Sequence, residues 1–401
     1  MKRLLIATLL VLLLACKREA PQPAESFLIS FKMPEECLQS ARYKGQKVVI
    51  SGATSYEFVT DAGGMITVSD LIPGIYDIIT SWEMSGADYK VLVKDPLTVD
   101  AKARVIVGVS LMNQRIFSGQ DLEIDLTSAV VRGLMISKLY YSGTKDQDAK
   151  NYTKDAYIEI FNNAEEVAYL DGKYLGLANS RSNTTYMYTV SESPDSIHLK
   201  QVCRFPGNGT DYPVQPGASV VIAAKGARNH LESGAIGSVD LSHADFEVKL
   251  MEGDGNPDVP MLPFVHQASN MKELNLLTSG PNAVVLFEAQ DQEEYDSWPV
   301  IKPGTLTESF KRIPKTAVID GMECLQKKDV VDVSSKRLQQ DIDAGYLTIN
   351  ATAGYTHESV DRKVSRFENG RYYLVDTNNT TVDFVVCLDP TPGKYDKEGL
   401  Q

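Results

Sequence analysis

Two groups of residues have types and spacings that are compatible with metal binding. Asp254, Asn256 and Asp258 place three oxygen ligands at alternate positions, as a calcium loop begins. Such a loop also needs a bidentate carboxylate at its twelfth position, which is Val265 here. The glycine and proline within this segment are typical of a solvated turn, and we favour that interpretation.

The second group is His230 and His243, accompanied by Asp240 and Asp245. Imidazole and carboxylate groups together suit a transition metal. The two histidines are thirteen positions apart in a segment rich in loop-forming residues, so we favour polar surface residues as the explanation. The sequence therefore predicts no metal site, and it gives no sign of a cofactor.

Catalytic motifs are incomplete in this chain. His357 and Glu358 begin a zinc-protease-like motif, but Asp361 occupies the position of its second histidine. Ser142 and Lys145 have Ser-x-x-Lys spacing without the motifs that accompany it in serine acyl-transfer enzymes. The sequence shows no nucleophile elbow, phosphate loop or dinucleotide fingerprint. We predict a non-enzymatic protein with no catalytic residue.

Glu159 is the one charged residue in an otherwise apolar run. A partly buried carboxylate usually bonds backbone amides or an arginine, and we expect this of Glu159, with Arg362 as one such arginine. The tyrosine pairs Tyr140–Tyr141 and Tyr372–Tyr373 are compatible with a glycan or protein contact surface. We favour the alternative that alternate members enter a sandwich core.

Four cysteines follow Cys16, at Cys37, Cys203, Cys324 and Cys387. Their separations fit no zinc pattern, which needs close pairs. An exported protein can form disulfides, and four cysteines allow three pairings that the sequence does not distinguish. Buried free thiols are the alternative.

The N-terminal segment predicts lipid attachment. Two basic residues precede an apolar run over residues 4–14, which is too short to cross a bilayer as a helix, and Ala15 and Cys16 follow. This pattern is typical of a bacterial lipoprotein signal, so we expect residues 1–15 to be removed and the Cys16 thiol to be acylated. Each buried methylene contributes about 0.8 kcal/mol to such an anchor. Polar, proline-containing residues 16–25 predict a tether.

Composition limits the partners of the chain. It is 43% hydrophobic and 23% charged, which is ordinary for globular domains, and its net charge of −13 becomes −15 without Lys2 and Arg3. An acidic chain without a basic block is a poor candidate for nucleic-acid binding. About 385 mature residues exceed what one core usually serves, so we expect more than one domain.

Residues 26–128 alternate short β-type runs with turn residues, as a β-sandwich does. Asp61 with Gly63 and Gly64 predicts a tight hairpin turn. The segment resembles carboxypeptidase-regulatory or transthyretin-like sandwiches, a resemblance that implies a rigid spacer or docking module. The residues that carry it are Thr60, Asp61, Gly63, Leu71, Pro73, Gly74 and Tyr76.

Residues 132–395 predict a second, larger all-β domain. Its strand-like runs cover residues 134–141, 156–163, 167–172, 216–223, 283–287 and 376–384. In order, these runs resemble those of bacterial lamin-tail domains, which implies an immunoglobulin-like sandwich. Lamin tails are about half this long, so we expect insertions near 228–282 and 304–355, and long insertions usually carry the specific function.

The whole chain resembles an uncharacterised family of Bacteroidota lipoproteins that joins these two modules. The resemblance implies two tandem β-sandwiches at the outer membrane, facing the periplasm or the cell surface, and no assigned activity. We therefore predict a binding or docking module whose partner is an outer-membrane transporter, another envelope protein or a glycan. The alternative is a polysaccharide-directed or metal-dependent hydrolase with its site in the insertions, because carboxylate pairs hydrolyse glycosides without any linear motif.

Overall fold

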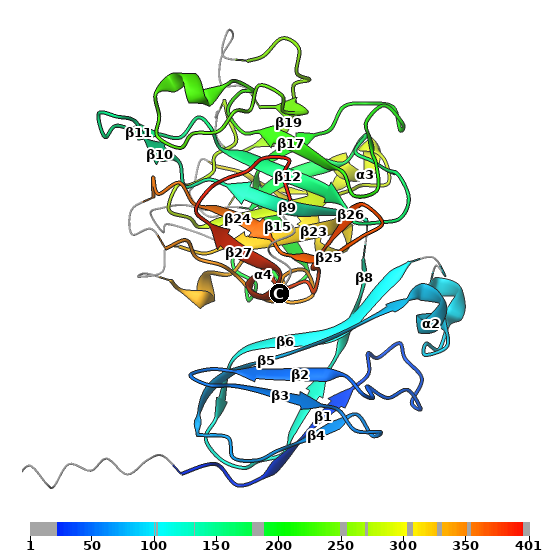
Figure 1. Cartoon of the computed structure of the whole chain (residues 1–401). Coiled ribbons are helices and arrows are strands. Elements are labelled where there is room, and N and C mark those ends of the chain that lie inside the picture. Colours follow the sequence, from blue (N-terminus) through cyan, green and yellow to red (C-terminus); the bar gives the residue numbers. More distant parts are fainter. Residues whose placement is uncertain are drawn as a thin grey trace, which may run out of the picture.

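The computed structural model describes residues 22–99, 101, 103–131, 133–178, 188–248, 255–268, 272–302, 308–326, 331–350 and 354–395. Figure 1 shows two bodies built almost entirely of strands, one above the other, which confirms the predicted all-β fold class. Cys16 and the predicted signal peptide lie outside the described residues. In the described part of the chain, no helix is long and apolar enough to cross a membrane.

The first body is a sandwich of a five-stranded and a three-stranded sheet, with strand orders β3-β2-β5-β6-β8 and β4-β1-β7. Its core lies between the sheets and includes Ile29, Ile50, Ile78 and Val107, all fully buried. Its elements are β1 (Phe27–Lys32), β2 (Lys47–Ser51), β3 (Ser55–Val59), β4 (Met65–Val68), β5 (Gly74–Ser85), α2 (Gly86–Lys90), η1 (Pro96–Thr98), β6 (Arg104–Ile116), β7 (Leu122–Asp125) and β8 (Thr127–Val131).

The turn at Asp61 forms, but it is not the hairpin that we predicted. The Asp61 carboxylate accepts hydrogen bonds from the amides of Gly63 (2.8 Å) and Met65 (2.9 Å), and Gly64 has a φ of +82°. The strands on either side pair with different partners, β3 with β2 and β4 with β1. The turn therefore carries the chain from one sheet of the sandwich to the other.

The second body contains a six-stranded sheet with the order β18-β17-β12-β9-β24-β27, and a seven-stranded sheet with the path β21-β22-β15-β14-β20-β23 and β19 paired to β15. The first comprises β9 (Leu134–Tyr140), β12 (Tyr157–Asn162), β17 (Ser219–Ala223), β18 (Phe246–Glu247), β24 (Ser359–Arg362) and β27 (Phe384–Cys387). The second comprises β14 (Tyr174–Ala178), β15 (Ser196–Arg204), β19 (Phe264–Gln267), β20 (Asn282–Phe287), β21 (Val300–Ile301), β22 (Phe310–Pro314) and β23 (Val318–Cys324).

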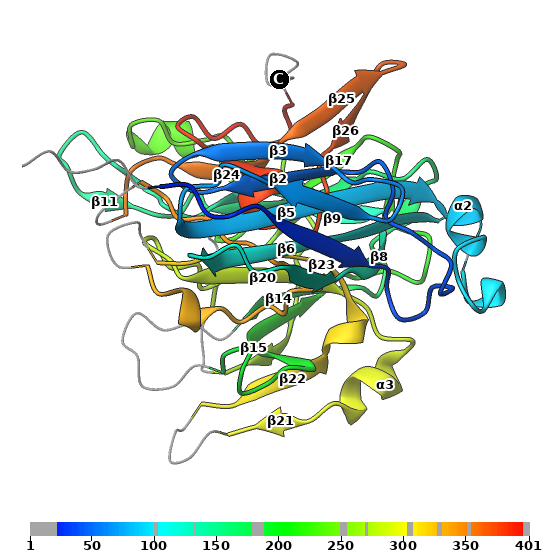
Figure 2. The same ribbon diagram turned by 90° about the horizontal axis from the view of Figure 1, so that it is seen from below.

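Shorter elements complete the second body, and Figure 2 shows the β25–β26 hairpin projecting from it. These elements are β10 (Thr144–Lys145), β11 (Asn151–Tyr152), β13 (Ala168–Tyr169), β16 (Pro213–Val214), η2 (His230–Ser233), α3 (Gln292–Ser297), η3 (Lys315–Ala317), η5 (Val333–Ser335), β25 (Val364–Glu368), β26 (Arg371–Leu374) and α4 (Thr380–Asp383).

Both faces of the two large sheets are buried. The main core lies between the sheets, and α3 and residues 338–342 cover the outer face of the seven-stranded sheet. Residues 227–244, β26 and the C-terminal segment cover the outer face of the six-stranded sheet. As a result every residue of β9, β12 and β20 is buried. In a sandwich whose sheets expose their outer face to water, only every second residue of a strand is buried.

Part of the expected insertion at 304–355 belongs to the sandwich itself. β22 and β23 are members of the seven-stranded sheet, where β23 pairs with β20 over six positions of register. The prediction that these strands belong to an insertion is wrong, because it assumed that the sandwich is no longer than a lamin-tail domain. Of the 228–282 segment, residues 239–244 pack over the six-stranded sheet, β18 and β19 pair with β17 and β15, and Leu262, Leu274 and Leu276 enter the core between the sheets.

The predicted run at residues 376–384 is not a single strand. Residues Thr380–Asp383 form α4, and β27 begins only at Phe384. The Asn379 carboxamide oxygen caps this turn of helix by accepting hydrogen bonds from the amides of Thr381 and Val382. Side-chain capping by asparagine competes with strand formation. This is why the alternation of apolar and polar residues wrongly predicted a single strand over residues 376–384.

All four described cysteines are free thiols, so the disulfide alternative is not realised among them. Cys37, Cys203 and Cys324 are buried and Cys387 is half-buried. Burial raises the pKa of the Cys324 thiol to about 12. These thiols behave as apolar core groups.

The two bodies touch through β6 of the first and two loops of the second. The Gln340 side-chain amide donates to the Ser110 carbonyl at 2.9 Å, and the Asn379 amide donates to the Ser110 hydroxyl. In Figure 1, β6 lies on the side of the first body that faces the second. Asn379 also caps α4, so the contact is continuous with the polar centre of the second sandwich.

Candidate functional site

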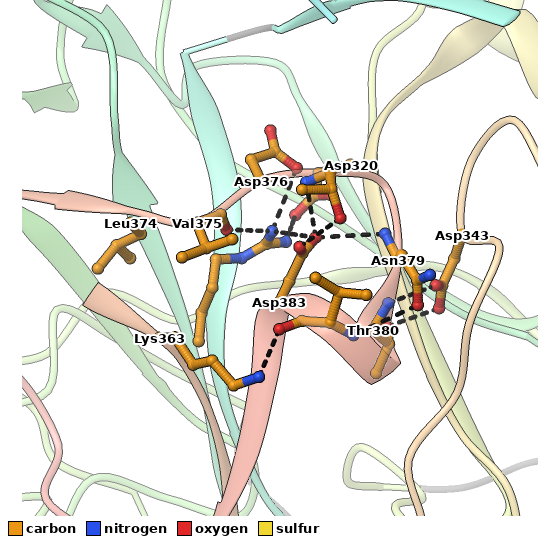
Figure 3. A network of polar contacts seen from close by, with 12 residues as sticks. Asp320, Asp343, Lys363, Leu374, Val375, Asp376, Asn379, Thr380 and Asp383 are labelled. Carbon is orange, nitrogen blue, oxygen red and sulfur yellow. Dashed lines mark hydrogen bonds and ion pairs between the residues drawn. The ribbon is translucent and has the colours of Figure 1, made fainter. Parts of the chain in front are cut away.

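A buried arginine holds one end of the second sandwich together (Figure 3). Arg362, at the end of β24, lies 2.9 Å from the Asp320 carboxylate, 3.2 Å from that of Asp376 and 3.3 Å from that of Asp383. Its guanidinium also donates to the carbonyls of Ile136 and Val375. This group connects both sheets through β9, β23 and β24.

The surroundings of Arg362 contain more carboxylate than cation. Burial raises the pKa of Asp320 to about 7 and that of Asp383 to about 6, although the Arg362 charge opposes both shifts. The nearby carboxylates in turn raise the pKa of Arg362. Arg362, Asp320 and Asp383 are buried, and their contacts form a polar connection between the sheets.

Glu159 is bonded as the sequence suggested, but not to Arg362. Its carboxylate accepts hydrogen bonds from the Gly393 amide at 2.9 Å and from the Tyr395 hydroxyl at 2.6 Å. Burial raises the pKa of Glu159. The arginine lies on β24, two strands away from β12, and is engaged by three aspartates, so Glu159 instead fixes the C-terminal segment.

A β-bulge helps to build this anchor. The register of β12 on β9 shifts between Glu159 and Ile160, so that Glu159 lies opposite Lys138 while Ile160 lies opposite Ile136. The extra residue is Ser137, whose hydroxyl lies 2.8 Å from the Tyr395 hydroxyl. The bulge therefore brings two consecutive polar side chains to the C-terminal segment.

Lys138 is the second polar contact to that segment. Its ammonium donates to the Thr391 carbonyl at 2.7 Å and to the Lys394 carbonyl, and it lies 4.7 Å from the centre of the Tyr395 ring. Asp361 completes its surroundings at 3.3 Å. Together these contacts hold the last described residues as one wall of a groove.

The tyrosine groove, as we name it, has a volume of about 750 Å³. It lies between the first half of β17 and the segment that ends at Tyr395. Tyr372 of β26 and Tyr395 line it, with ring centres 5.9 Å apart. The other lining residues that carry charge or can titrate are Asp240, His243, Asp245 and Lys394.

The two carboxyl groups of the tyrosine groove have different surroundings. Partial burial raises the pKa of Asp245, whose Oδ2 accepts the Val221 amide at 2.8 Å. Burial also acts on Asp240, but hydrogen bonds from the Ser242 hydroxyl (2.7 Å) and amide (2.9 Å) outweigh it and lower the pKa. The groove therefore offers one carboxyl group that holds its proton more readily than the other.

The predicted pair His230 and His243 does not form one site. His243 is exposed and lines the tyrosine groove, whereas His230 is buried and lines a separate pocket. The His230 ring bonds the Tyr152 hydroxyl at 2.7 Å through Nδ1 and lies near the Gly226 carbonyl through Nε2. Burial lowers the pKa of His230 to about 4, so the ring is neutral near pH 7.

The calcium-like segment forms a turn within the described residues. The Asn256 carboxamide oxygen accepts the Asp258 amide at 3.1 Å, and its nitrogen donates to the Ser242 carbonyl at 3.1 Å. Asp254 lies outside the described residues. Over the described ranges, no group of three or more His, Cys, Asp or Glu side chains has an arrangement that could hold a metal ion.

The other motif residues are engaged in the fold. The buried Ser142 hydroxyl accepts the Glu358 amide at 2.8 Å, while Lys145 is exposed. His357 lies 4.0 Å from Asp389 at the surface. Among the tyrosine pairs, Tyr140 and Tyr141 are both buried, whereas Tyr372 is half-buried and reaches the groove.

Sequence reasoning grouped Asp240, His243 and Asp245 and noted Tyr372 separately, but it did not bring Tyr372 to that group. It missed Tyr395 and Lys394, which complete the groove. No linear signal marks these two residues, because they act through contacts with strands more than 200 positions earlier.

The fold and the groove define the chain as an all-β protein with two β-sandwich bodies and a solvent-accessible groove on the second. Residues 215–391 match the model of a family described as "Protein of unknown function (DUF4876)". The matched segment includes Asp240, Asp245 and Tyr372 and ends before Lys394 and Tyr395.

A crystal structure of a DUF4876 family protein from Bacteroides thetaiotaomicron VPI-5482 is similar over 93% of this chain and 99% of that chain, with a TM-score of 0.59 and 21% identity. A chain from Bacteroides ovatus described as a "putative adhesin" covers 52% of this chain and 75% of its own length at 8% identity, with a TM-score of 0.15 on which no argument rests. No curated protein matches. The first of these structures supports the fold. The family model over residues 215–391 supports the resemblance to an uncharacterised family, while the two domain types and the lipid anchor stay predictions.

Proposed function

We propose that the chain is a lipid-anchored, non-enzymatic binding module that holds a saccharide in the tyrosine groove. The observation that carries this proposal is the meeting of an aromatic ring with carboxylate, imidazole and ammonium groups in one accessible hollow of about 750 Å³. Binding sites for small ligands combine apolar or aromatic surface with a few oriented polar groups in this way.

The aromatic part of the groove suits a sugar ring. Tyr372 packs against Phe367, with ring centres 4.7 Å apart, and against Tyr395 at 5.9 Å. These neighbours restrict the ring before any ligand arrives, which lowers the entropic cost of binding. A pyranose presents apolar C–H groups that pack on such a ring.

The polar part of the groove suits hydroxyl groups. Asp240 and Asp245 supply carboxylate acceptors, and Lys394 and His243 supply donors. The Asp245 Oδ2 and the Asp240 Oδ1 are held by backbone amides, so both carboxylates are oriented before binding. Charge-assisted hydrogen bonds to sugar hydroxyls are the expected contacts.

Tyr372→Ala will weaken saccharide binding about tenfold, because the loss of one stacking ring removes roughly 1.4 kcal/mol. A glycan array is the first measurement, and calorimetry with the best oligosaccharide on the array is the second. Tyr169→Ala is the matched control, since Tyr169 is a similarly accessible tyrosine on β13 outside the groove. Equal affinity in the two variants, or no glycan bound by the wild type, contradicts the proposal.

Hydrolysis of a polysaccharide at the same groove is a second candidate function. The observation that favours it is the divergence of the two carboxyl groups, with the pKa of Asp245 raised and that of Asp240 lowered. Such divergence is how glycosidases assign an acid and a base. Mass spectrometry of glycans incubated with the protein distinguishes the two functions. Cleavage products that form with the wild type but not with Asp245→Asn support hydrolysis, and glycan that is bound but stays intact supports the binding module.

The proposed lipid anchor depends on Cys16, which precedes the described residues. We expect Cys16→Ala to move the protein from the membrane fraction to the soluble fraction, because the acyl chains supply the membrane affinity. Fractionation with metabolic labelling by an alkyne fatty acid measures both effects. A variant that stays in the membrane fraction contradicts the lipid anchor.

An outer-membrane transporter is the partner that we propose for the anchored chain. A C-terminal tag permits purification from detergent-solubilised membranes, followed by mass spectrometry. Stoichiometric recovery of a transporter supports a docking role, and recovery of the chain alone directs the search to soluble glycans.

A further inference from the structure

A second hollow, which we name the basic pocket, lies on the other side of the loop that carries Asp240. It has a volume of about 610 Å³ and lies between the end of β11, the residues after β17, and η2. Asn229 forms an isolated bridge with Asp240, so one loop separates the basic pocket from the tyrosine groove. His230 lines the former and His243 the latter.

The lining of the basic pocket has the opposite charge to the chain as a whole. Of the described residues that line it, Lys154, Lys225 and Arg228 are cationic, and Glu232 alone carries a carboxylate. The net charge of the chain is −13, so chance placement favours acidic linings. Three cations around one hollow repel one another, and this repulsion costs free energy.

Lys225 is the most enclosed cation of the pocket. Burial lowers the pKa of Lys225, the carboxylates of Glu273 and Asp155 oppose this shift, and the Lys154 charge makes a smaller contribution that lowers the pKa. Lys225 is held by the Thr153 hydroxyl at 3.1 Å and by Glu273 at 3.8 Å, so its position is fixed. Lys154 is exposed at the mouth, and none of the ion pairs found among the described residues involves it.

The neutral polar groups of the pocket are held by contacts within the protein. The buried His230 ring accepts at Nδ1 from the Tyr152 hydroxyl if its Nε2 carries the proton toward the Gly226 carbonyl. The Asn256 side chain is held by the Ser242 carbonyl. The polar walls are therefore held in place, and the described side chains that line the hollow carry three positive charges and one negative charge.

We propose that the basic pocket binds the oxyanion group of a ligand, a carboxylate, sulfate or phosphate, through Lys154, Lys225 and Arg228. Lysine and arginine form strong charge-assisted hydrogen bonds to such groups. Because the pocket is concave and the rest of the chain is acidic, a compact anion fits it better than an extended polyanion, which the remaining surface repels. This site is independent of saccharide binding in the tyrosine groove.

The test uses the whole chain without its signal and three probes, namely sodium sulfate, potassium phosphate and sodium glucuronate, at an ionic strength held constant with sodium chloride. A ligand that binds the folded state raises the melting temperature in proportion to its affinity. We expect one probe to raise it at millimolar concentration. Stronger binding of glucuronate identifies an acidic sugar as the source of the anion, and stronger binding of phosphate or sulfate identifies an ester or free ion.

Lys154→Ala is the decisive variant, because Lys154 is exposed and its removal leaves the fold intact. We expect about tenfold weaker binding of the best probe, with recovery in Lys154→Arg. Lys150→Ala is the matched control, as Lys150 is exposed on the same hairpin and outside the pocket. Equal responses of the wild type and Lys154→Ala, or a response no larger than that to chloride, overturn the proposal.

Discussion

Replacement of Arg362 by methionine will lower the free energy of unfolding by about 3–5 kcal/mol at pH 7, the usual cost of removing one partner from a buried ionic group. Methionine fills much of the arginine volume but carries no charge. Asp320, Asp376 and Asp383 then lie buried without the cation that each contacts within 3.3 Å. The carbonyls of Ile136 and Val375 also lose their donor.

The cost of this substitution will depend on pH. In the wild type the pKa of Asp320 in the folded state, about 7, lies above its ordinary value of 3.8. The contribution of this group to stability is therefore greatest below pH 3.8 and is lost as the pH rises through 7. Without Arg362 the folded pKa rises further, and the loss at high pH is larger. The difference in stability between wild type and variant will therefore be largest above pH 7 and will narrow toward pH 4.

Urea unfolding at several pH values measures this difference. Arg366→Met is the matched control, because Arg366 is an arginine of β25 whose ion pair with Glu368 is exposed, and such pairs contribute about 0–1 kcal/mol. A pH-independent cost, or an equal cost in both variants, contradicts the role that we assign to Arg362.

The sequence predicted the strands with apolar runs and missed elements that depend on polar side chains. β9, β12 and β20 were found because their runs are apolar. α4 was missed because the Asn379 cap and the Asp383 carboxylate, which accepts the Thr377 amide, decide the conformation of a polar segment. The alternation of apolar and polar residues in the sequence does not reveal such hydrogen bonds.

Double burial of the sheets also escaped prediction. Leu241 and Ala244 cover Tyr140 and Tyr157 on the outer face of the six-stranded sheet, although they come from a segment expected to be a surface insertion. The sequence does not show which surface an apolar residue of a loop will pack against, so that contact is known only once the fold is known. The same limit applies to Tyr395, whose position depends on Glu159 far earlier in the chain.

Glu323 explains how the second sandwich holds the segment between η5 and residue 350, and its substitution is the second change with a large expected effect. Glu323 is fully buried on β23, and its carboxylate accepts the Arg337 amide (3.0 Å) and Nε (2.9 Å) and the Leu338 amide (3.1 Å). Lys336 lies 3.3 Å away. Burial acts to raise the pKa of Glu323, but these cations and amides lower it overall, so the group is charged in the fold.

Glu323→Gln will cost about 3–4 kcal/mol, because the new amide group cannot accept as many hydrogen bonds and two cations lose their buried counter-charge. Hydrogen exchange will show the loss first in residues 331–350, which the carboxylate ties to β23. Since the pKa of Glu323 is lowered in the folded state, this stabilisation is present above the ordinary value of 4.5 and is lost as the pH falls through the lowered pKa. The cost of Glu323→Gln will therefore persist through pH 5–7, where the cost of Arg362→Met already narrows. Glu368→Gln, on the exposed hairpin, is the control and is expected to change stability by less than about 0.5 kcal/mol. If exchange instead rises uniformly over the second sandwich, Glu323 stabilises the whole domain and not this segment.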